Sequence, residues 1–167
     1  MSELIKSKRV TDNPVLLKSK YGKALHCLLL PLQDDKLLLP NTAVAEVITY
    51  INPESIDNAP DWLMGTITWR DIRIPLVSFE LLSGLAVTSG GTRRIAVLNT
   101  LNGNQHIPYI AILIQGIPQL RLIQEDSIQD EDIENDKLTI ASVVKVNGEQ
   151  VLIPDLDDLE SRLKQIL

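Results

Sequence analysis

The side chains that most often carry catalysis are few in this chain, and their spacing does not group them. The only two histidines are His26, within an apolar run, and His106, beside a turn. Zinc needs several Cys or His ligands close together, and no such spacing occurs. Nor is there a serine nucleophile elbow or a phosphate loop of the Gly-Lys-Ser/Thr type. The sequence therefore predicts a protein that is not an enzyme and that uses no cofactor and no metal.

Two stretches have a composition similar to that of ligand-binding motifs. Gly90-Gly91-Thr92 is glycine-rich, but no strand leads directly into it and no helix follows, as a phosphate loop requires. The acidic group Asp155, Asp157 and Asp158 has the composition of a metal site. These carboxylates fit better in the first turn of a helix, where the helix dipole favours negative charge. We therefore interpret both stretches as structural.

The cysteine and the hydropathy pattern bear on location. The single cysteine, Cys27, cannot form an internal disulfide, which fits a reducing cytosol. Its leucine-rich surroundings predict a buried structural thiol. No apolar run approaches the ~20 residues that a membrane-spanning helix requires. The first ten residues also lack the apolar core of a secretory signal. We therefore expect a cytoplasmic protein without direct membrane insertion.

Charge excludes one large class of partner. The net charge of −6 argues against a nucleic-acid binder, whose affinity comes from phosphate neutralisation. The charges are unevenly placed: residues 1–23 are mostly basic, and residues 125–136 contain seven acidic residues and no basic one. Blocks of like charge usually stay solvated. We interpret them as a flexible basic tail and a solvated acidic loop, and a binding role for either stays open.

The stretch from Pro60 to Val77 predicts a hairpin. Ile67 and Trp69 fall on one face of a strand, whereas Thr66, Thr68 and Arg70 fall on the other. Such alternation is typical of a half-buried strand. The turn is expected at residues 70–71, where Asp tolerates the positive φ that a two-residue turn needs.

The rest of the chain is also rich in strand patterns. Apolar runs predict strands at 24–32, 37–39, 47–51, 94–98, 107–114, 120–123, 138–146 and 150–153. Helical turns are expected at 42–45, capped by Asn41, and at 79–85, closed by Gly84. Only residues 155–167 have the caps, charges and apolar stripe of a full helix, with Leu159 and Leu163 in that stripe. The fold class is mainly β.

An internal repeat predicts how these strands are organised. Residues 37–56 match residues 109–128 at a constant offset, and Gly65 to Pro75 then matches Ala141 to Pro154. Two similar halves imply two similar small barrels in one body. We expect a tail over residues 1–23 and one domain over 24–167. Its halves would span about 24–85 and 92–154, followed by the helix.

Two motifs carry a family resemblance. Gly65, Arg70 and Pro75 are each separated by four residues and lead into an apolar run; upstream stands Leu39-Pro40 followed by Val44-Ala45-Glu46-Val47. This pattern resembles CheW-like domains, the coupling adaptors of bacterial chemosensory arrays, over about residues 25–160. Asp71 and Gln115 depart from it, since the family usually has Gly and Asp there. The amino-acid sequence of these motifs is most similar to that of ChpC-type accessory adaptors of pilus-linked chemosensory systems.

The resemblance implies a fold and a function. CheW-like domains consist of two five-stranded, SH3-like β-barrels that share a core. They are non-enzymatic scaffolds, which implies that this chain couples chemoreceptors to a CheA-type histidine kinase in a two-component pathway, here a type IV pilus pathway. The implied partners are the regulatory domain of that kinase and the cytoplasmic tip of methyl-accepting chemoreceptors.

The resemblance also implies a site. The matching Glu46 and Arg70 would lie near one another in the groove between the barrels and contact the receptor tip, with Val44 and Thr68 flanking the same surface. The alternative is an ordinary surface ion pair worth ~0–1 kcal/mol. The repeat gives the second half no counterpart of Glu46, and residues 145–147 stand in place of Arg70.

Two other functions remain open. The chain could be a small-ligand-binding β-barrel, which a sizeable apolar cavity between the halves would favour. It could instead be a structural cap or competitor within the signalling array. Binding to a kinase without an effect on its activity would favour that role.

Overall fold

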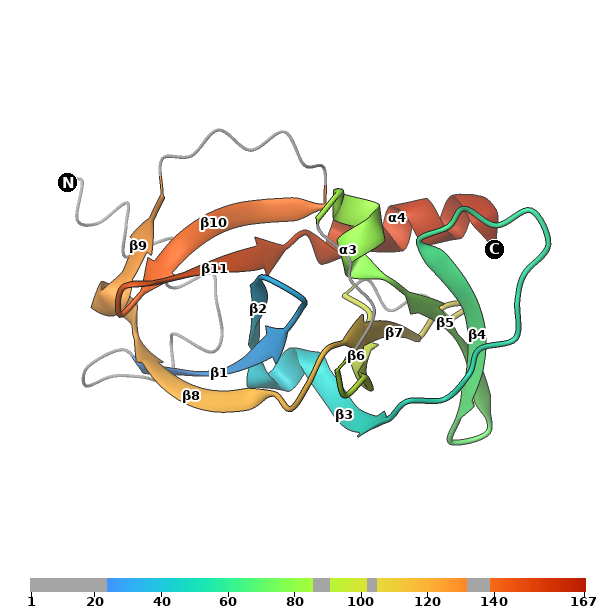
Figure 1. Cartoon of the computed structure of the whole chain (residues 1–167), viewed down its shortest axis with the longest axis horizontal. Coiled ribbons are helices and arrows are strands. Elements are labelled where there is room, and N and C mark those ends of the chain that lie inside the picture. The colour runs from blue at the N-terminus through green and yellow to red at the C-terminus, as the bar shows by residue number, and fades with distance from the viewer. Residues whose placement is uncertain (1–23, 86–90, 102–104, 132–138) are drawn as a thin grey trace.

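The computed structural model describes residues 24–85, 91–101, 105–131 and 139–167 (Figure 1). The expected basic tail, residues 86–90 of the glycine-rich stretch and residues 132–136 of the expected acidic loop lie outside the described residues. The described chain is mainly β, with two sheets, two short 3-10 helices and two α-helices. The predicted fold class is confirmed. Within this part of the chain, no helix is long and apolar enough to span a bilayer.

The first barrel, here called barrel A, is a sheet of six strands. Their order is β8-β1-β2-β11-β10-β9. The bounds are β1 Ala24–Pro31, β2 Lys36–Pro40, β8 Gln119–Gln124, β9 Ile128–Asp130, β10 Ile140–Val146 and β11 Glu149–Pro154. A single turn of 3-10 helix, η2 (Glu125–Ser127), interrupts the chain between β8 and β9. The strands on either side of η2, β8 and β9, form the two opposite edges of the sheet. This barrel therefore has six strands instead of the expected five.

The second barrel, barrel B, is a sheet of five strands in the order β3-β6-β7-β5-β4. The bounds are β3 Val44–Thr49, β4 Leu63–Trp69, β5 Ile72–Val77, β6 Arg94–Asn99 and β7 Tyr109–Ile114. Most neighbours are antiparallel. The one parallel contact in each barrel joins β5 to β7 here and β11 to β2 in barrel A.

The two barrels do not coincide with the two halves of the sequence. The hairpin of β1 and β2 belongs to the first half but completes barrel A with strands of the second half. Conversely, β6 and β7 complete barrel B with strands of the first half. The expected division near residues 85–92 therefore does not separate the barrels. The repeat predicted two barrels but not this exchange of hairpins.

The repeat is visible in the backbone. A β-bulge lies between Leu63 and Gly65 in β4, and another lies between Ile140 and Ser142 in β10. Each of these two strands is followed by a two-residue turn with positive φ angles, then by a return strand (β5 or β11) and a capped helix. In this alignment the counterpart of Gly65 is Ser142. The sequence match with Ala141 was therefore wrong by one residue.

The buried apolar residues of the described chain form three clusters. Cys27, Leu29 and Val144 belong to the interior of barrel A, and Ile67, Trp69 and Val97 to that of barrel B. A larger central cluster draws on both barrels and both α-helices. Cys27 is buried as predicted, and burial raises the pKa of its thiol to about 11.

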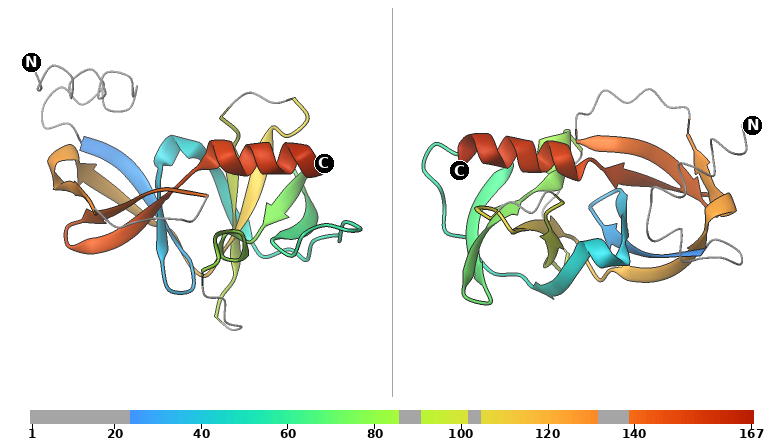
Figure 2. Two further views of the ribbon diagram at one scale, coloured as in Figure 1. Left: turned by 90° about the horizontal axis from the view of Figure 1, so that it is seen from above. Right: turned by 180° about the vertical axis from the view of Figure 1, so that it is seen from behind.

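The helices confirm most of the capping signals. Helix α4 (Leu156–Ile166) begins after Asp155, whose side chain accepts a hydrogen bond from the backbone of Asp158. Its residues Leu159 and Leu163 are fully buried in the central cluster. Both views in Figure 2 show α4 extending from barrel A toward barrel B. The expected stripe thus joins the two barrels.

The short helices differ in detail from the prediction. Helix α3 (Phe79–Ser83) is closed by Gly84 in the left-handed conformation, as expected, and is capped by Ser78. The 3-10 helix η1 (Asn41–Ala43) follows Pro40 and has no side-chain cap, so the capping role given to Asn41 was wrong. Strand β9 lies inside the stretch expected to be only an acidic loop.

Candidate functional site

The candidate site begins with the turn between β4 and β5. Arg70 and Asp71 both have positive φ angles, 48° and 63°, and Trp69 pairs with Ile72 across the turn. This is the geometry of a two-residue hairpin turn whose twist matches the flanking strands. The turn places Arg70 at the tip of the hairpin, where its side chain is 64% exposed.

A second backbone irregularity orients Glu46. The register of β3 against β6 shifts between Val44, opposite Leu98, and Glu46, opposite Val97. Directly opposite residues share one face of a sheet. Val97 belongs to the interior cluster of barrel B. The bulge therefore turns Glu46 toward the end of that interior.

At this end of the barrel, Glu46 contacts the tip of the hairpin. Its carboxylate accepts a hydrogen bond of 2.7 Å from Nε1 of Trp69, and its other oxygen lies 3.5 Å from Nη2 of Arg70. The guanidinium carbon of Arg70 stands 4.6 Å from the centre of the Trp69 ring. Tyr109 supports that ring edge-on, with the ring centres 4.8 Å apart. We call these four residues the barrel B mouth.

The structure brings together two of the four predicted site residues. Val44 lies opposite Leu98 and packs against the central cluster, so the bulge separates its face from that of Glu46. Thr68 is exposed and lies opposite Arg73 on the outer face of the hairpin. In the sheet, Val44 and Thr68 therefore lie on other faces than Glu46. Their contact with a partner stays a prediction.

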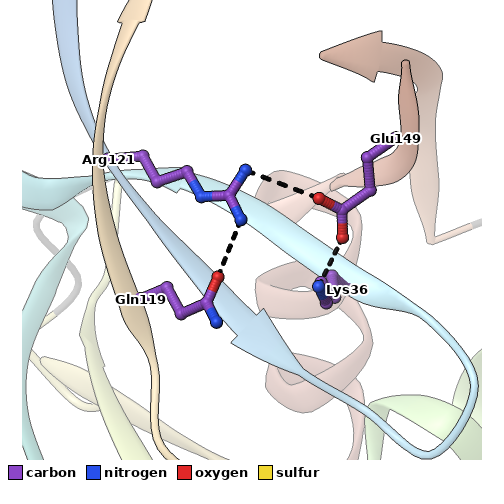
Figure 3. Close-up of polar contacts among 4 residues, drawn as sticks. All are labelled: Lys36, Gln119, Arg121 and Glu149. Atoms are coloured by element: carbon purple, nitrogen blue, oxygen red, sulfur yellow. Dashed lines mark hydrogen bonds and ion pairs between the residues drawn. The ribbon is translucent and has the colours of Figure 1, made fainter. Parts of the chain in front are cut away.

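Barrel A has a charged group at the corresponding end. Figure 3 shows Glu149, at the start of β11, between Lys36 of β2 and Arg121 of β8. Its two oxygens contact Lys36 Nζ and, at 3.5 Å, Arg121 Nη1. Arg121 also donates a 2.9 Å hydrogen bond to Gln119. We call these four residues the barrel A mouth.

This second group also faces a barrel interior. Arg121 lies opposite Cys27 and Gln119 lies opposite Leu29, and both of those partners belong to the interior cluster of barrel A. The hydrogen bond from Lys36 and the nearby positive charge of Arg121 lower the pKa of Glu149. The arrangement can hold three strands together by a charge-assisted network.

Sequence reasoning missed the barrel A mouth entirely. The repeat was aligned a few residues out of register there, so it gave Glu46 no counterpart and placed residues 145–147 in the position of Arg70. Alternation along β8, with Ile123 inward, was the available signal that Arg121 also points inward. Alternation placed Trp69 on the same strand face as Ile67, and both are buried, but the hydrogen bond from Trp69 to Glu46 was not foreseen.

The described residues contain no group of three or more His, Cys, Asp or Glu side chains that could hold a metal ion. Two of the hollows lined by described residues adjoin barrel A. One of about 470 Å³ lies beside Lys36 and Glu149, and one of about 350 Å³ is lined mainly by apolar residues such as Leu39, Ile153 and Leu156.

Comparisons with known proteins agree with this picture. One solved structure, that of the scaffolding protein TtCheW from Thermoanaerobacter tengcongensis, superposes with a TM-score of 0.66 at 17% sequence identity. The match covers 78% of this chain and 88% of that one, which shows a shared fold. A comparison with curated protein sequences gives no significant match. The family model of the CheW-like domain matches residues 26–163, nearly the whole chain. The chain therefore belongs to the CheW-like domain family, whose members are non-catalytic scaffold proteins.

Proposed function

We propose that this chain is a cytoplasmic adaptor that couples methyl-accepting chemoreceptors to the regulatory domain of a CheA-type histidine kinase, in a pathway linked to type IV pili. Family membership supports the scaffold role. The observation that carries the receptor contact is the barrel B mouth, where Glu46 and Arg70 lie within 3.5 Å at an exposed hairpin tip.

The geometry of the barrel B mouth suits recognition of a protein surface. Arg70 is held on one side by the Trp69 ring and by Glu46, while most of its side chain faces solvent. A guanidinium whose position is already restricted loses less conformational freedom when it binds a carboxylate or a carbonyl. Glu46 is itself fixed by the Trp69 hydrogen bond. The mouth thus offers a pre-oriented donor and acceptor to a polar helix tip.

The test compares two arginines of one hairpin. Arg70→Glu should weaken binding to a purified receptor cytoplasmic fragment by at least about tenfold, because it places two carboxylates together and removes the donor. Arg73→Glu is the matched control. Arg73 is equally exposed but pairs with Glu54 and Thr66 on the outer face. Binding that is unchanged in Arg70→Glu, with an intact unfolding transition, would overturn the role of the barrel B mouth.

Kinase coupling needs its own measurement. We expect the regulatory domain of a CheA-type kinase to be captured by the wild-type chain and by Arg70→Glu alike, because receptor and kinase use different surfaces. Kinase activity should then rise or fall when receptor is added to the wild-type mixture only. Binding to kinase without any change in its activity would favour the structural cap or competitor instead.

A small-ligand-binding barrel remains the second candidate because of the apolar hollow near Ile153. It lies between residues of the first half, including Leu39, and the start of α4. Its volume of about 350 Å³ is at the lower end of the range of small-molecule pockets. An Ile153→Trp variant should fill it. Loss of receptor-dependent kinase control in that variant, with both partners still bound, would favour the ligand-binding role.

A further inference from the structure

A buried carboxylate lies where the two barrels meet. Glu80, in the first turn of α3, is 1% exposed and forms no ion pair with any described residue. Two donors contact it instead: the backbone N–H of Gln33 at 2.9 Å and Nε2 of Gln115 at 3.2 Å. A buried charge is tolerated only when such bonds replace its hydration. These two bonds therefore determine where the carboxylate lies.

The side-chain amide of Gln115 is oriented toward this carboxylate. Its Nε2 donates to Glu80, and its buried Oε1 has no hydrogen-bond partner within the described part of the chain. The opposite orientation of the amide would bring two acceptor oxygens to the same short separation. The bond to Glu80 therefore decides the orientation, although it leaves the amide oxygen unsatisfied.

The two donors come from different barrels. Gln33 lies in the turn between β1 and β2 of barrel A, whereas Gln115 directly follows β7 of barrel B. The backbone N–H of Gln115 also donates a 2.8 Å hydrogen bond to the oxygen of Pro31, at the end of β1. A Cβ on Gly116 would lie 3.5 Å from Cγ of Pro31, which is van der Waals contact. The turn of barrel A thus rests on the end of barrel B, and Glu80 joins the two.

The same turn leads into the barrel A mouth. A 2.8 Å hydrogen bond from the N–H of Leu32 to the oxygen of Asp35 closes the turn, and Lys36 is the next residue. Lys36 contacts Glu149 across the mouth. Only two residues separate the backbone donor of Glu80 from Lys36. The place of Lys36 therefore depends on the place of the turn.

We propose that Glu80 is a positioning residue: it fixes the β1–β2 turn of barrel A on barrel B and thereby places Lys36 against Glu149. The arrangement of charge that barrel A presents at its mouth is then set from the other barrel. A buried polar contact without this role would differ, because its loss would lower stability and leave the mouth of the folded protein unchanged.

The test is Glu80→Gln in the full-length chain, a change that keeps the shape of the side chain. It replaces one acceptor oxygen by an NH2 donor, which must face the N–H of Gln33 or the amide of Gln115. The readout is the pKa of Glu149, measured by NMR of its carboxyl carbon during a pH titration. The hydrogen bond from Lys36 is the main cause that lowers this pKa. Displacement of the turn should therefore raise the pKa toward its ordinary value.

The sign of that change separates positioning from simple electrostatics. Glu80→Gln removes a negative charge, and the loss of a like charge by itself lowers the pKa of another acid. A rise in the pKa of Glu149 therefore requires movement of Lys36. The matched control is Ser83→Ala, which removes a buried hydrogen bond from the same helix to Thr139, outside the turn. It should lower the midpoint of urea unfolding and leave the pKa of Glu149 at the wild-type value.

Three results would overturn the proposal. One is an unchanged or lower pKa of Glu149 in folded Glu80→Gln. Another is an equal rise in Ser83→Ala, which would assign the rise to lost stability. The third needs no variant and so applies even where Glu80→Gln does not fold. It is exchange of the Gln33 amide proton in the wild type as fast as in an unstructured peptide, which would show that Glu80 does not hold the turn.

Discussion

The two barrel mouths have the same scaffold and opposite arrangements of charge. In the barrel B mouth the acid, Glu46, lies on an inward position of β3 and the base, Arg70, lies at the hairpin tip. In the barrel A mouth the base, Arg121, lies on an inward position of β8, and the acid, Glu149, follows the hairpin tip. A repeated backbone can therefore keep its bulges, turns and caps while the charged residues at its ends are exchanged.

The surroundings of the two acids differ as much as their positions. Glu149 is shared between two cations, and neither of these side chains is more than 36% exposed. Glu46 has one indole donor and one arginine at a longer distance, and that arginine is mostly exposed. The barrel A mouth is thus internally satisfied, whereas the barrel B mouth retains an arginine that can accept a new partner.

The largest expected difference between the barrels concerns their bulges. Gly65 has a φ of 142°, and a Cβ there would lie 2.2 Å from the backbone oxygen of Glu54. Gly65→Ala should therefore lower the free energy of unfolding by about 3 kcal/mol or more, through strain and backbone overlap. Its counterpart Ser142→Ala should change it by less than about 0.5 kcal/mol. Urea unfolding of both variants measures this, and equal effects would show that the two bulges have equivalent environments.

The next difference concerns the indole. Trp69→Phe removes the donor to Glu46 and part of the buried ring, and we expect a loss of about 1–2 kcal/mol in unfolding free energy. Adding Glu46→Gln should then cost little, because the main partner of the carboxylate is already gone. Urea unfolding of the single and double variants tests this. Full additivity of the two losses would contradict a shared hydrogen bond.

We expect Glu149 of the barrel A mouth to make the free energy of unfolding depend on pH. The lowered pKa of Glu149 means that the folded state favours the charged carboxylate. Its contribution is present above the pKa of the unfolded chain, about 4.3, and is lost as the pH falls through the lower folded value. Solvent screening limits it to about 1 kcal/mol or less. Thermal unfolding of wild type and Glu149→Gln between pH 3 and pH 7 should therefore converge at the acidic end. A constant gap across that range would contradict the assignment.

The smallest effect is expected for the ion pair of the barrel B mouth. A double-mutant cycle of Glu46→Gln and Arg70→Gln should give a coupling of about 0.5 kcal/mol or less, because the pair is long and exposed. The equivalent cycle of Glu149→Gln and Lys36→Gln should give a larger value. If the order were reversed, Arg70 would be a structural residue and would be less suited to exchange partners.

The sequence predicted the local structure well where one physical cause dominates. Alternation identified the strand that contains Ile67 and Trp69, and the turn followed from residues that tolerate positive φ. Asp155 marked the start of α4 through its capping chemistry. The family resemblance, carried by motifs around Glu46 and Arg70, predicted the architecture. It also implied that these two residues lie near one another, as they do in the ion pair.

Other features could not be predicted because they depend on contacts between distant segments. The exchange of hairpins follows from which strand edges meet, and no local pattern near Ala24 or Arg94 records it. The bulge that separates Val44 from Glu46 adds one residue to β3, and a sequence read with strict alternation places both on one face. The same kind of slip hid Arg121, since the repeat alignment was out of register at β8.

The exchange of hairpins has a consequence for the chain as a folding unit. A break between α3 and β6 would leave the N-terminal fragment with three strands of barrel B and the hairpin of barrel A. The C-terminal fragment would keep four strands of barrel A and the hairpin of barrel B. Neither fragment could close a barrel alone, because each parallel contact, β5 with β7 and β2 with β11, would then join two molecules. The two pieces should stay unfolded apart and restore the native structure when mixed, as complementing fragments do. In the intact chain, each half contributes strands to both barrels. Unfolding of one barrel should therefore disrupt the other, and we expect both to unfold in a single transition.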